Sequence, residues 1–434
     1  MAKMHLAPTK PKVALKVVAG RYIWSRIISM MTLGKIFRNA FIAALVLFFL
    51  FTLSYAKETS TELSQDLEKS MEPEVRGNLQ LEKILKERSD FADKYGTTFA
   101  FLLNSQIQSI LYSKRNEGNS RASWYYNLAL EQRIWKDAFV HAELEGGHNK
   151  GIDKILPSFS VFNSDAGEVS YAYIAKLYLN QDLLEKKLSL TAGKMDLSDW
   201  FDNNLVANSG DTQFLSSSLV DNLAIPFPEL GLGAMAVFNP ADWFYFQIGA
   251  SDTKSVSTRV GLNNAFGGAF LISELGFSPK ISGLQGNYRF IVNLVREKLE
   301  RIDGSGEKNQ DYGYALSFDQ QVTKHITLFC RYGFADRKVR DIEHFWSIGG
   351  QISEPVLGRK DDVFGAGMAQ SILGEDYRQA YESASAETIY EIYYNFSWHP
   401  FVKIIPNIQV MTHPDAERDI SCSVVIGSRL VVIF

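Results

Sequence analysis

Apolar and polar side chains alternate along most of this chain, and that two-residue period constrains the fold more than any other feature of the sequence. In the stretch 388–398, TIYEIYYNFSW, one parity holds Tyr390, Ile392, Tyr394, Phe396 and Trp398, and the other holds Glu391, Tyr393, Asn395 and Ser397. Successive side chains of a β-strand point to opposite faces, whereas a helix brings residues three and four apart together. The period therefore predicts strands with one apolar and one polar face.

The same pattern recurs in sixteen segments of the chain. The predicted strands span 97–112, 123–135, 137–146, 169–181, 186–195, 230–238, 243–251, 268–278, 286–297, 312–322, 325–333, 345–353, 361–370, 388–398, 401–411 and 420–434. An even number of strands suits a bacterial barrel with both chain ends in the periplasm.

The connections between these segments alternate in length, which supports the same arrangement. Tight turns fall at 136, 239–242, 323–324 and 399–400. Longer connections fall at 147–168, 196–229, 298–311 and 371–387. Short periplasmic turns on one side and longer external loops on the other are typical of outer-membrane barrels.

One-sided alternation also fits a soluble antiparallel sandwich. Two features favour the membrane barrel: the apolar faces carry aromatic residues near their ends, and the opposite faces carry Arg, Glu, Asp and Asn. A mean hydropathy of −0.10 excludes a multi-helix membrane protein, and 13% aromatic residues exclude a disordered chain. The predicted fold is all-β: a 16-stranded antiparallel transmembrane outer-membrane β-barrel with a short N-terminal helical segment.

The first 56 residues are predicted to be an upstream extension, 1–29, followed by an export signal. The apolar run 40–53 is shorter than the roughly 20 residues that a spanning helix needs, Lys35 and Arg38 precede it, and Ser54-Tyr55-Ala56 follows it. These are the parts of a signal peptide, with cleavage expected after Ala56; a membrane anchor is the alternative. Residues 57–96 are then a helical periplasmic segment, and residues 97–434 form the barrel.

The charge of the exported chain excludes one class of partner. Residues 1–56 hold eight of the 45 basic residues and none of the 49 acidic ones, so the exported chain would carry a net charge of −12. Such a chain is poorly suited to bind nucleic acid. The expected surroundings are outer-membrane lipid and lipopolysaccharide, and the final strand ends in Phe434, a recognition mark for the barrel-assembly machinery. Association into homo-oligomers stays open.

Several ordered motifs between about 190 and 434 resemble the OprB-type carbohydrate-selective porin family. They are GKMDLSDWFDNN (193–204), GNYRF (286–290), FCRYG (329–333), WSIGG (346–350), GRKDD (358–362) and ETIYEIYY (387–394). The resemblance implies a sixteen-stranded barrel that conducts small sugars down their gradient, without a cofactor and without energy coupling.

Residues on the polar parity are predicted to face a wet lumen. They are Glu131, Arg133, Arg289, Asp319, Arg331, Glu391, Tyr393 and Arg429. Together they have mixed sign, unlike the single-sign ring of a strongly ion-selective pore. Neutral, hydroxyl-rich sugars suit hydrogen-bonding charged groups and aromatic rings at a narrowing. A solvated lumen charge without a special role is the alternative for each of these residues.

The longest connection, 196–229, is predicted to fold inward and form part of the constriction. It carries Asp196, Asp199, Trp200, Asp202, Asn203, Asn204 and Gln213. Acids and amides beside a tryptophan suit contact with polyols. The alternative is a surface loop held by turn-forming Asn and Asp, and the spacing of the acids matches no complete calcium loop.

The sequence contains no complete catalytic motif. The sequence lacks HExxH and CxxC, and His141, Glu143 and Glu145 are alternate inward positions of one strand. The two cysteines, Cys330 and Cys422, fall on the outward parity. The predicted function is therefore a non-enzymatic porin for small carbohydrates. Alternatives are a general polar-solute porin, a barrel-type adhesin, or an exported glycoside hydrolase that uses two carboxylates.

Overall fold

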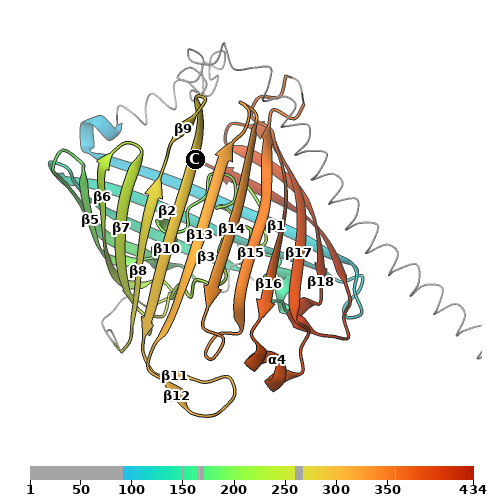
Figure 1. Ribbon diagram of the computed structural model, residues 1–434. Coiled ribbons are helices and arrows are strands. Elements are labelled where there is room, and N and C mark those ends of the chain that lie inside the picture. The colour runs from blue at the N-terminus through green and yellow to red at the C-terminus, as the bar shows by residue number, and fades with distance from the viewer. Residues whose placement is uncertain (1–90, 149–150, 165, 167–170, 260–266, 357) are drawn as a thin grey trace, which may run out of the picture. The chain divides into compact units, whose positions relative to one another are not determined.

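The computed structural model describes residues 91–434 except 149–150, 165, 167–170, 260–266 and 357. These residues form an antiparallel sheet that closes on itself, because β1 (Thr97–Tyr112) pairs with β2 (Ser120–Trp135) on one side and with β19 (Ser423–Ile433) on the other. Figure 1 shows the strands inclined side by side around one barrel. The predicted 16-stranded antiparallel barrel is confirmed.

The other barrel strands follow in chain order, each beside its neighbour. They are β3 (Ala138–His148), β4 (Tyr173–Leu183), β5 (Leu188–Met195), β6 (Gly231–Ala241), β7 (Phe244–Asp252), β8 (Ala269–Phe277), β10 (Leu284–Arg296), β13 (Asp311–Gln321), β14 (Ile326–Ala335), β15 (Ile342–Ser353), β16 (Val363–Leu373), β17 (Ala386–His399) and β18 (Val402–Thr412). Every boundary of these sixteen barrel strands lies within four residues of its predicted position, whereas the two-residue strands β9, β11 and β12 were not predicted.

Short turns and long loops lie at opposite ends of the barrel, as the connection lengths predict. The hairpin β11 (Leu299–Glu300)–β12 (Glu307–Lys308) and the helix α4 (Glu375–Tyr381) occupy the lower end in Figure 1. At the other end, β9 (Lys280–Ile281) pairs with the start of β10 across Ser282 and Gly283. Both turn residues have positive φ, 51° and 81°, which is the backbone of a two-residue hairpin turn that matches the twist of the strands.

The N-terminal predictions fall largely outside the described residues. Residues 91–95 are helical, which is the described end of the predicted helical segment. The expected signal peptide, its cleavage after Ala56 and residues 57–90 lie in the part that is not described.

The outward faces of the strands are apolar and exposed, as a wall in contact with lipid requires. Leu130, Leu275, Phe290 and Leu430 are examples from four different strands. Cys330 is likewise exposed and free. The apolar parity of the sequence therefore identifies the lipid-facing side chains of the wall.

The inward faces of the strands are more varied than the predicted wet lumen. Phe270 and Ile272 of β8 and Ile291 and Val295 of β10 face inward and are buried in an apolar cluster. Apolar side chains on the inside of a barrel need a cover, and in this structure the cover is a loop.

Candidate constriction site

Residues 196–229, called the inward loop below, run from the end of β5 to the start of β6 through the inside of the barrel. Side chains from distant strands bind its backbone. Asp319 on β13 accepts a hydrogen bond from Leu205 N at 3.3 Å, and Glu391 on β17 accepts one from Leu215 N at 2.8 Å. Partners this far apart around the barrel place the loop across the interior.

Arg331 of β14 holds two separated points of the inward loop. Its Nε lies 3.2 Å from Asp202 Oδ1, one Nη donates to the Asp202 carbonyl at 3.0 Å, and the other donates to the Leu219 carbonyl at 3.3 Å. Glu274 of β8 completes the attachment by accepting from Asp202 N at 2.9 Å. Arg331 is 2% exposed, so its charge is satisfied by the loop and not by water.

Arg429 of β19 binds the tip of the inward loop in the same manner. Its guanidinium donates to the Gly210 carbonyl and, at 2.6 Å, to the Gln213 carbonyl. The guanidinium also lies over the ring of Tyr393, 6.0 Å from its centroid. Tyr393 packs in turn against Phe214 of the loop, with a centroid distance of 5.0 Å. The loop tip is therefore held from the last strand of the barrel.

Glu391 and Glu387 on β17 each receive backbone N–H groups from a loop. Glu391 accepts from Leu215 N at 2.8 Å and from Ser216 N at 2.9 Å. Glu387 accepts from Ser160 N at 2.6 Å, which belongs to a second inward segment, residues 151–164. Both side chains are 0% exposed, so water cannot replace these hydrogen bonds, and both segments are firmly attached to one strand.

One titratable group of the second segment has a displaced pKa. Burial raises the pKa of Asp153 to about 7, although the side chain accepts hydrogen bonds from backbone groups of the same segment. One of these comes from Phe162 N at 2.7 Å. The carboxyl group is thus close to half-protonated at neutral pH.

Glycines in the wall make room for the apolar side chains of the inward loop. A Cβ at Gly249 would lie 2.9 Å from Phe201, and a Cβ at Gly367 would lie 3.0 Å from Phe214 and from Leu219. Contacts this short are not tolerated between real side chains, so glycine permits the close approach. Loop and wall are packed like a protein core at these points.

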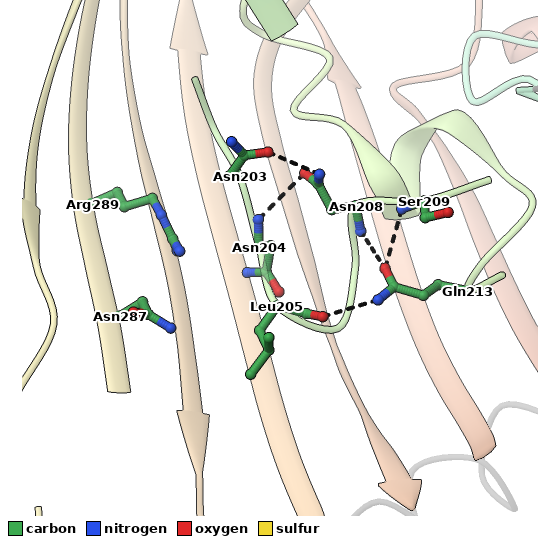
Figure 2. A pocket seen from close by; sticks show the side chains of 8 residues that line it. All are labelled: Asn203, Asn204, Leu205, Asn208, Ser209, Gln213, Asn287 and Arg289. Carbon is green, nitrogen blue, oxygen red and sulfur yellow. Dashed lines mark hydrogen bonds between the residues drawn. The ribbon is translucent and has the colours of Figure 1, made fainter. Parts of the chain in front are cut away.

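The edge of the inward loop that carries Asn203, Asn208 and Gln213 is polar and uncharged. Asn203 Oδ1 accepts from Asn208 Nδ2 at 2.8 Å, and Gln213 Oε1 accepts from Asn208 N at 2.7 Å. Together with Asn287 and Arg289 of β10 these residues line a recess of about 340 Å³. Figure 2 shows the two β10 side chains opposite the amides of the loop.

With the fold and this geometry established, the chain can be compared with known proteins. Residues 133–434 match the family described as "Carbohydrate-selective porin, OprB family". The chain belongs to the OprB family. This confirms the resemblance drawn from the sequence motifs, and the family and the closed barrel are those of an outer-membrane porin.

Individual relatives of this OprB-family chain are distant. It is 22% identical to Porin AaxA of Chlamydia abortus, over 78% of this chain and 71% of that protein. It is 21% identical to Porin B of Pseudomonas aeruginosa, over 60% of this chain and 68% of that protein. The high pH structure of Pseudomonas putida OprB superposes with a TM-score of 0.73 at 18% identity, over 81% of this chain and 97% of that one. That likeness supports the fold alone.

The predicted wall residues of this family member point inward, but most are covered. Arg289, Asp319, Arg331, Glu391, Tyr393 and Arg429 are all buried. Arg289 is paired with Asp319 at 2.8 Å, and the others bind or pack against the inward loop as described. Glu131 is half-exposed on β2, and Arg133 is exposed near the end of that strand.

The predicted loop residues divide into two groups. Asp202 and Asn204 are buried against the wall, whereas Asp199 is exposed and Trp200, Asn203 and Gln213 are partly exposed. Asp196 serves the local backbone, because its carboxylate accepts from Ser198 N at 2.9 Å at the start of η2 (Leu197–Asp199).

The site residues predicted from the sequence did not include Glu274, Glu387, Asn208 or Asn287. The polar parity of strands 268–278 and 286–297 would have pointed to Glu274 and Asn287, and the amide-rich stretch 203–213 to Asn208.

Within the described part of the chain, no group of three or more His, Cys, Asp or Glu residues could hold a metal ion. No helix among the same residues is long and apolar enough to cross a bilayer.

Proposed function

We propose that this porin lets small carbohydrates diffuse passively through a constriction bounded by the inward loop. The observation that carries the proposal is that the wall and the loop present different groups to the interior. Charged wall residues such as Arg331 and Arg429 are buried beneath the loop, while amides of Asn203, Asn208 and Gln213 line the recess. Amides both donate and accept hydrogen bonds, as sugar hydroxyls do, and attract no ion.

The residues named from the sequence take two roles in this proposal. Asp199, Trp200, Asn203 and Gln213 are the solute-facing groups. Buried Asp202, Asp319, Arg331, Glu391, Tyr393 and Arg429 are positioning residues that hold the loop and so set the width of the passage, and Arg289, paired with Asp319, lines the recess opposite the loop. The description of the OprB family supports carbohydrate as the substrate class.

Liposome swelling tests the proposal. Proteoliposomes are diluted into isotonic glucose, maltose or a neutral amino acid of similar size, and the swelling rates are compared. We expect the sugars to enter faster than the size-matched solute. Replacing Trp200 or Asn203 by Ala reduces that preference, whereas Asn239→Ala, at an exposed position near the end of β6, leaves it unchanged. Equal rates for all solutes in the native protein would favour a general polar-solute porin.

Conductance separates this function from the other classes. A porin gives stepwise currents across a planar bilayer, whereas an adhesin barrel or an exported glycoside hydrolase gives none. We propose that the protein has no catalytic activity and needs no cofactor, so swelling proceeds without any added metal, nucleotide or energy source.

The same proposal covers export and insertion. We infer that the chain is cleaved after Ala56 and contacts lipid and lipopolysaccharide through its outer wall. We also infer that the barrel-assembly machinery recognises its last strand through Phe434. The Phe434 ring packs against Phe99 and Phe401, at centroid distances of 6.0 and 5.5 Å. N-terminal sequencing of the membrane-extracted protein checks the cleavage, and loss of membrane yield in Phe434→Ala checks the recognition.

A further inference from the structure

A row of charged side chains crosses the inner wall from β2 to the start of the inward loop. Each neighbour in the row is within ion-pair distance: Glu131 and His141 at 3.2 Å, His141 and Glu143 at 3.3 Å, Glu143 and Lys176 at 3.3 Å, and Lys176 and Asp199 at 2.8 Å. Both ring nitrogens of His141 meet a carboxylate, and both can donate only when the imidazole is protonated. The row, called the charge ladder below, then alternates in sign along its whole length.

Aromatic rings lie directly beside the charge ladder. Tyr178 stacks on His141, with a centroid distance of 4.7 Å and an interplanar angle of 9°, and meets Trp200 edge-on at 5.5 Å. Both Tyr178 and Trp200 are partly buried against an apolar cluster of the interior. A rigid ring surface therefore adjoins the hydrogen-bonding groups.

The ladder is fixed in its middle and open at its ends. The side chains of His141, Glu143 and Lys176 are 7–15% exposed, while those of Glu131 and Asp199 are 46% and 37% exposed. The inner end also joins the amide edge of the inward loop, because Asn203 Nδ2 donates to the Asp199 carbonyl at 2.9 Å. Ladder, rings and amides form one continuous surface.

This combination matches a sugar ring better than an ion or an apolar solute. Alternating signs present donors and acceptors in turn, which suits hydroxyl groups that do both. The same alternation cancels most of the long-range field that a single-sign ring would exert on an ion. The apolar face of a pyranose packs on an aromatic ring, while its hydroxyl groups point to the sides.

We propose that the charge ladder, Tyr178 and Trp200 form a binding subsite for one neutral pyranose inside the channel. The inference rests on the proposed carbohydrate function and goes further by naming the wall formed by β2, β3 and β4, beside the start of the inward loop, as the place where the sugar ring is held.

Block of single-channel current by glucose tests the subsite. Glucose is titrated against native protein, Tyr178→Leu and Glu143→Gln, with sorbitol as an open-chain polyol that lacks the ring. We expect glucose to block the native channel at lower concentration than sorbitol. In each variant the half-blocking glucose concentration rises about five- to tenfold, and the difference from sorbitol shrinks. This is the size of one lost ring contact for Tyr178→Leu. For Glu143→Gln it is the size of one typical hydrogen bond, because the buried Glu143 holds His141 and Lys176 in place.

Two controls keep the outcomes distinct. Tyr314→Leu changes a lipid-facing tyrosine and leaves glucose block as in the native channel, and heat-modifiable migration on gels verifies that each variant has folded. No block of the native channel by any sugar overturns the carbohydrate function itself. Equal block of native, Tyr178→Leu and Glu143→Gln channels, with the native one blocked, overturns the subsite alone.

Discussion

Replacing Glu391 by Gln should release the inward loop from the wall. Four donors point at the native carboxylate: Leu215 N at 2.8 Å and Asn407 Nδ2 at 3.2 Å on Oε1, and Ser216 N at 2.9 Å and Gln409 Nε2 at 3.1 Å on Oε2. A glutamine keeps one oxygen and puts an NH₂ group in place of the other. Asn407 can turn its amide so that Oδ1, which has no partner in the native site, accepts from the new NH₂ group, but a backbone N–H cannot turn. At least one buried backbone donor, Leu215 N or Ser216 N, therefore faces another donor.

The magnitude follows from the burial of the site. Glu391 is 0% exposed, so water cannot take over the lost hydrogen bonds. A buried donor left without a partner costs about 1–3 kcal/mol in the docked state. Because 1.4 kcal/mol corresponds to about a factor of ten, the undocked loop becomes at least about fivefold more populated.

Two assays measure how far the inward loop has left the wall. Single-channel recordings of Glu391→Gln should show a larger mean conductance and more open-channel noise than the native protein. Limited digestion with chymotrypsin should cut after Phe214, which is 0% exposed in the docked loop. Glu300→Gln, an exposed residue on β11, serves as the matched control. If Glu391→Gln conducts and resists digestion like the control, the carboxylate does not hold the loop and our reasoning is wrong.

Three further predictions concern the attachment of the loops. Gly367→Leu should push Phe214 and Leu219 away from the wall and raise conductance, whereas Ala366→Leu on the lipid side should not; equal conductances would contradict the packing argument. Arg429→Lys keeps the charge but loses the planar fork whose two nitrogens donate to separate carbonyl groups, so we expect noisier openings and a several-fold weaker sugar block in bilayer recordings. For Asp153 the folded pKa of about 7 exceeds the ordinary 3.8, so its stabilising contribution is complete below about pH 4 and is lost as pH rises through 7. Chymotryptic cleavage of residues 151–164 at pH 8 should therefore be slower in Asp153→Asn than in the native protein, with little difference at pH 5.

The barrel could be predicted from the sequence because its outer wall obeys one simple rule. A strand in contact with lipid must be apolar at every second residue, and segment 388–398 shows this without help from the rest of the chain. Strand 268–278 differs from this rule, because it carries apolar residues on both faces. Its two faces carry Leu271 and Leu275 on one side and Phe270 and Ile272 on the other, a pattern that indicates a covered inner wall.

The contacts of the site could not be predicted in the same way. The Arg331–Asp202 pair joins residues 129 positions apart, and Glu391 meets Leu215 across 176 positions. Parity shows that Arg331 and Glu391 face inward, but it carries no information on which loop atoms fill the interior. The sequence likewise shows His141 and Glu143 only as ordinary inward positions. Their place beside Lys176 and Tyr178 depends on the register of β3 and β4.

The distribution of the attachment points implies an order of assembly. The inward loop leaves the wall after β5, yet it is held by Arg331 on β14, Glu391 on β17 and Arg429 on β19. None of these three attachments can form until the last third of the polypeptide has joined the sheet. These three attachments therefore form late, after Glu274 on β8 can already bind Asp202 N, and a barrel halted before that step should admit larger solutes than the finished one. Pulse proteolysis at Phe214 during refolding, timed against the gel-mobility shift that marks closure, would reveal this sequence of events.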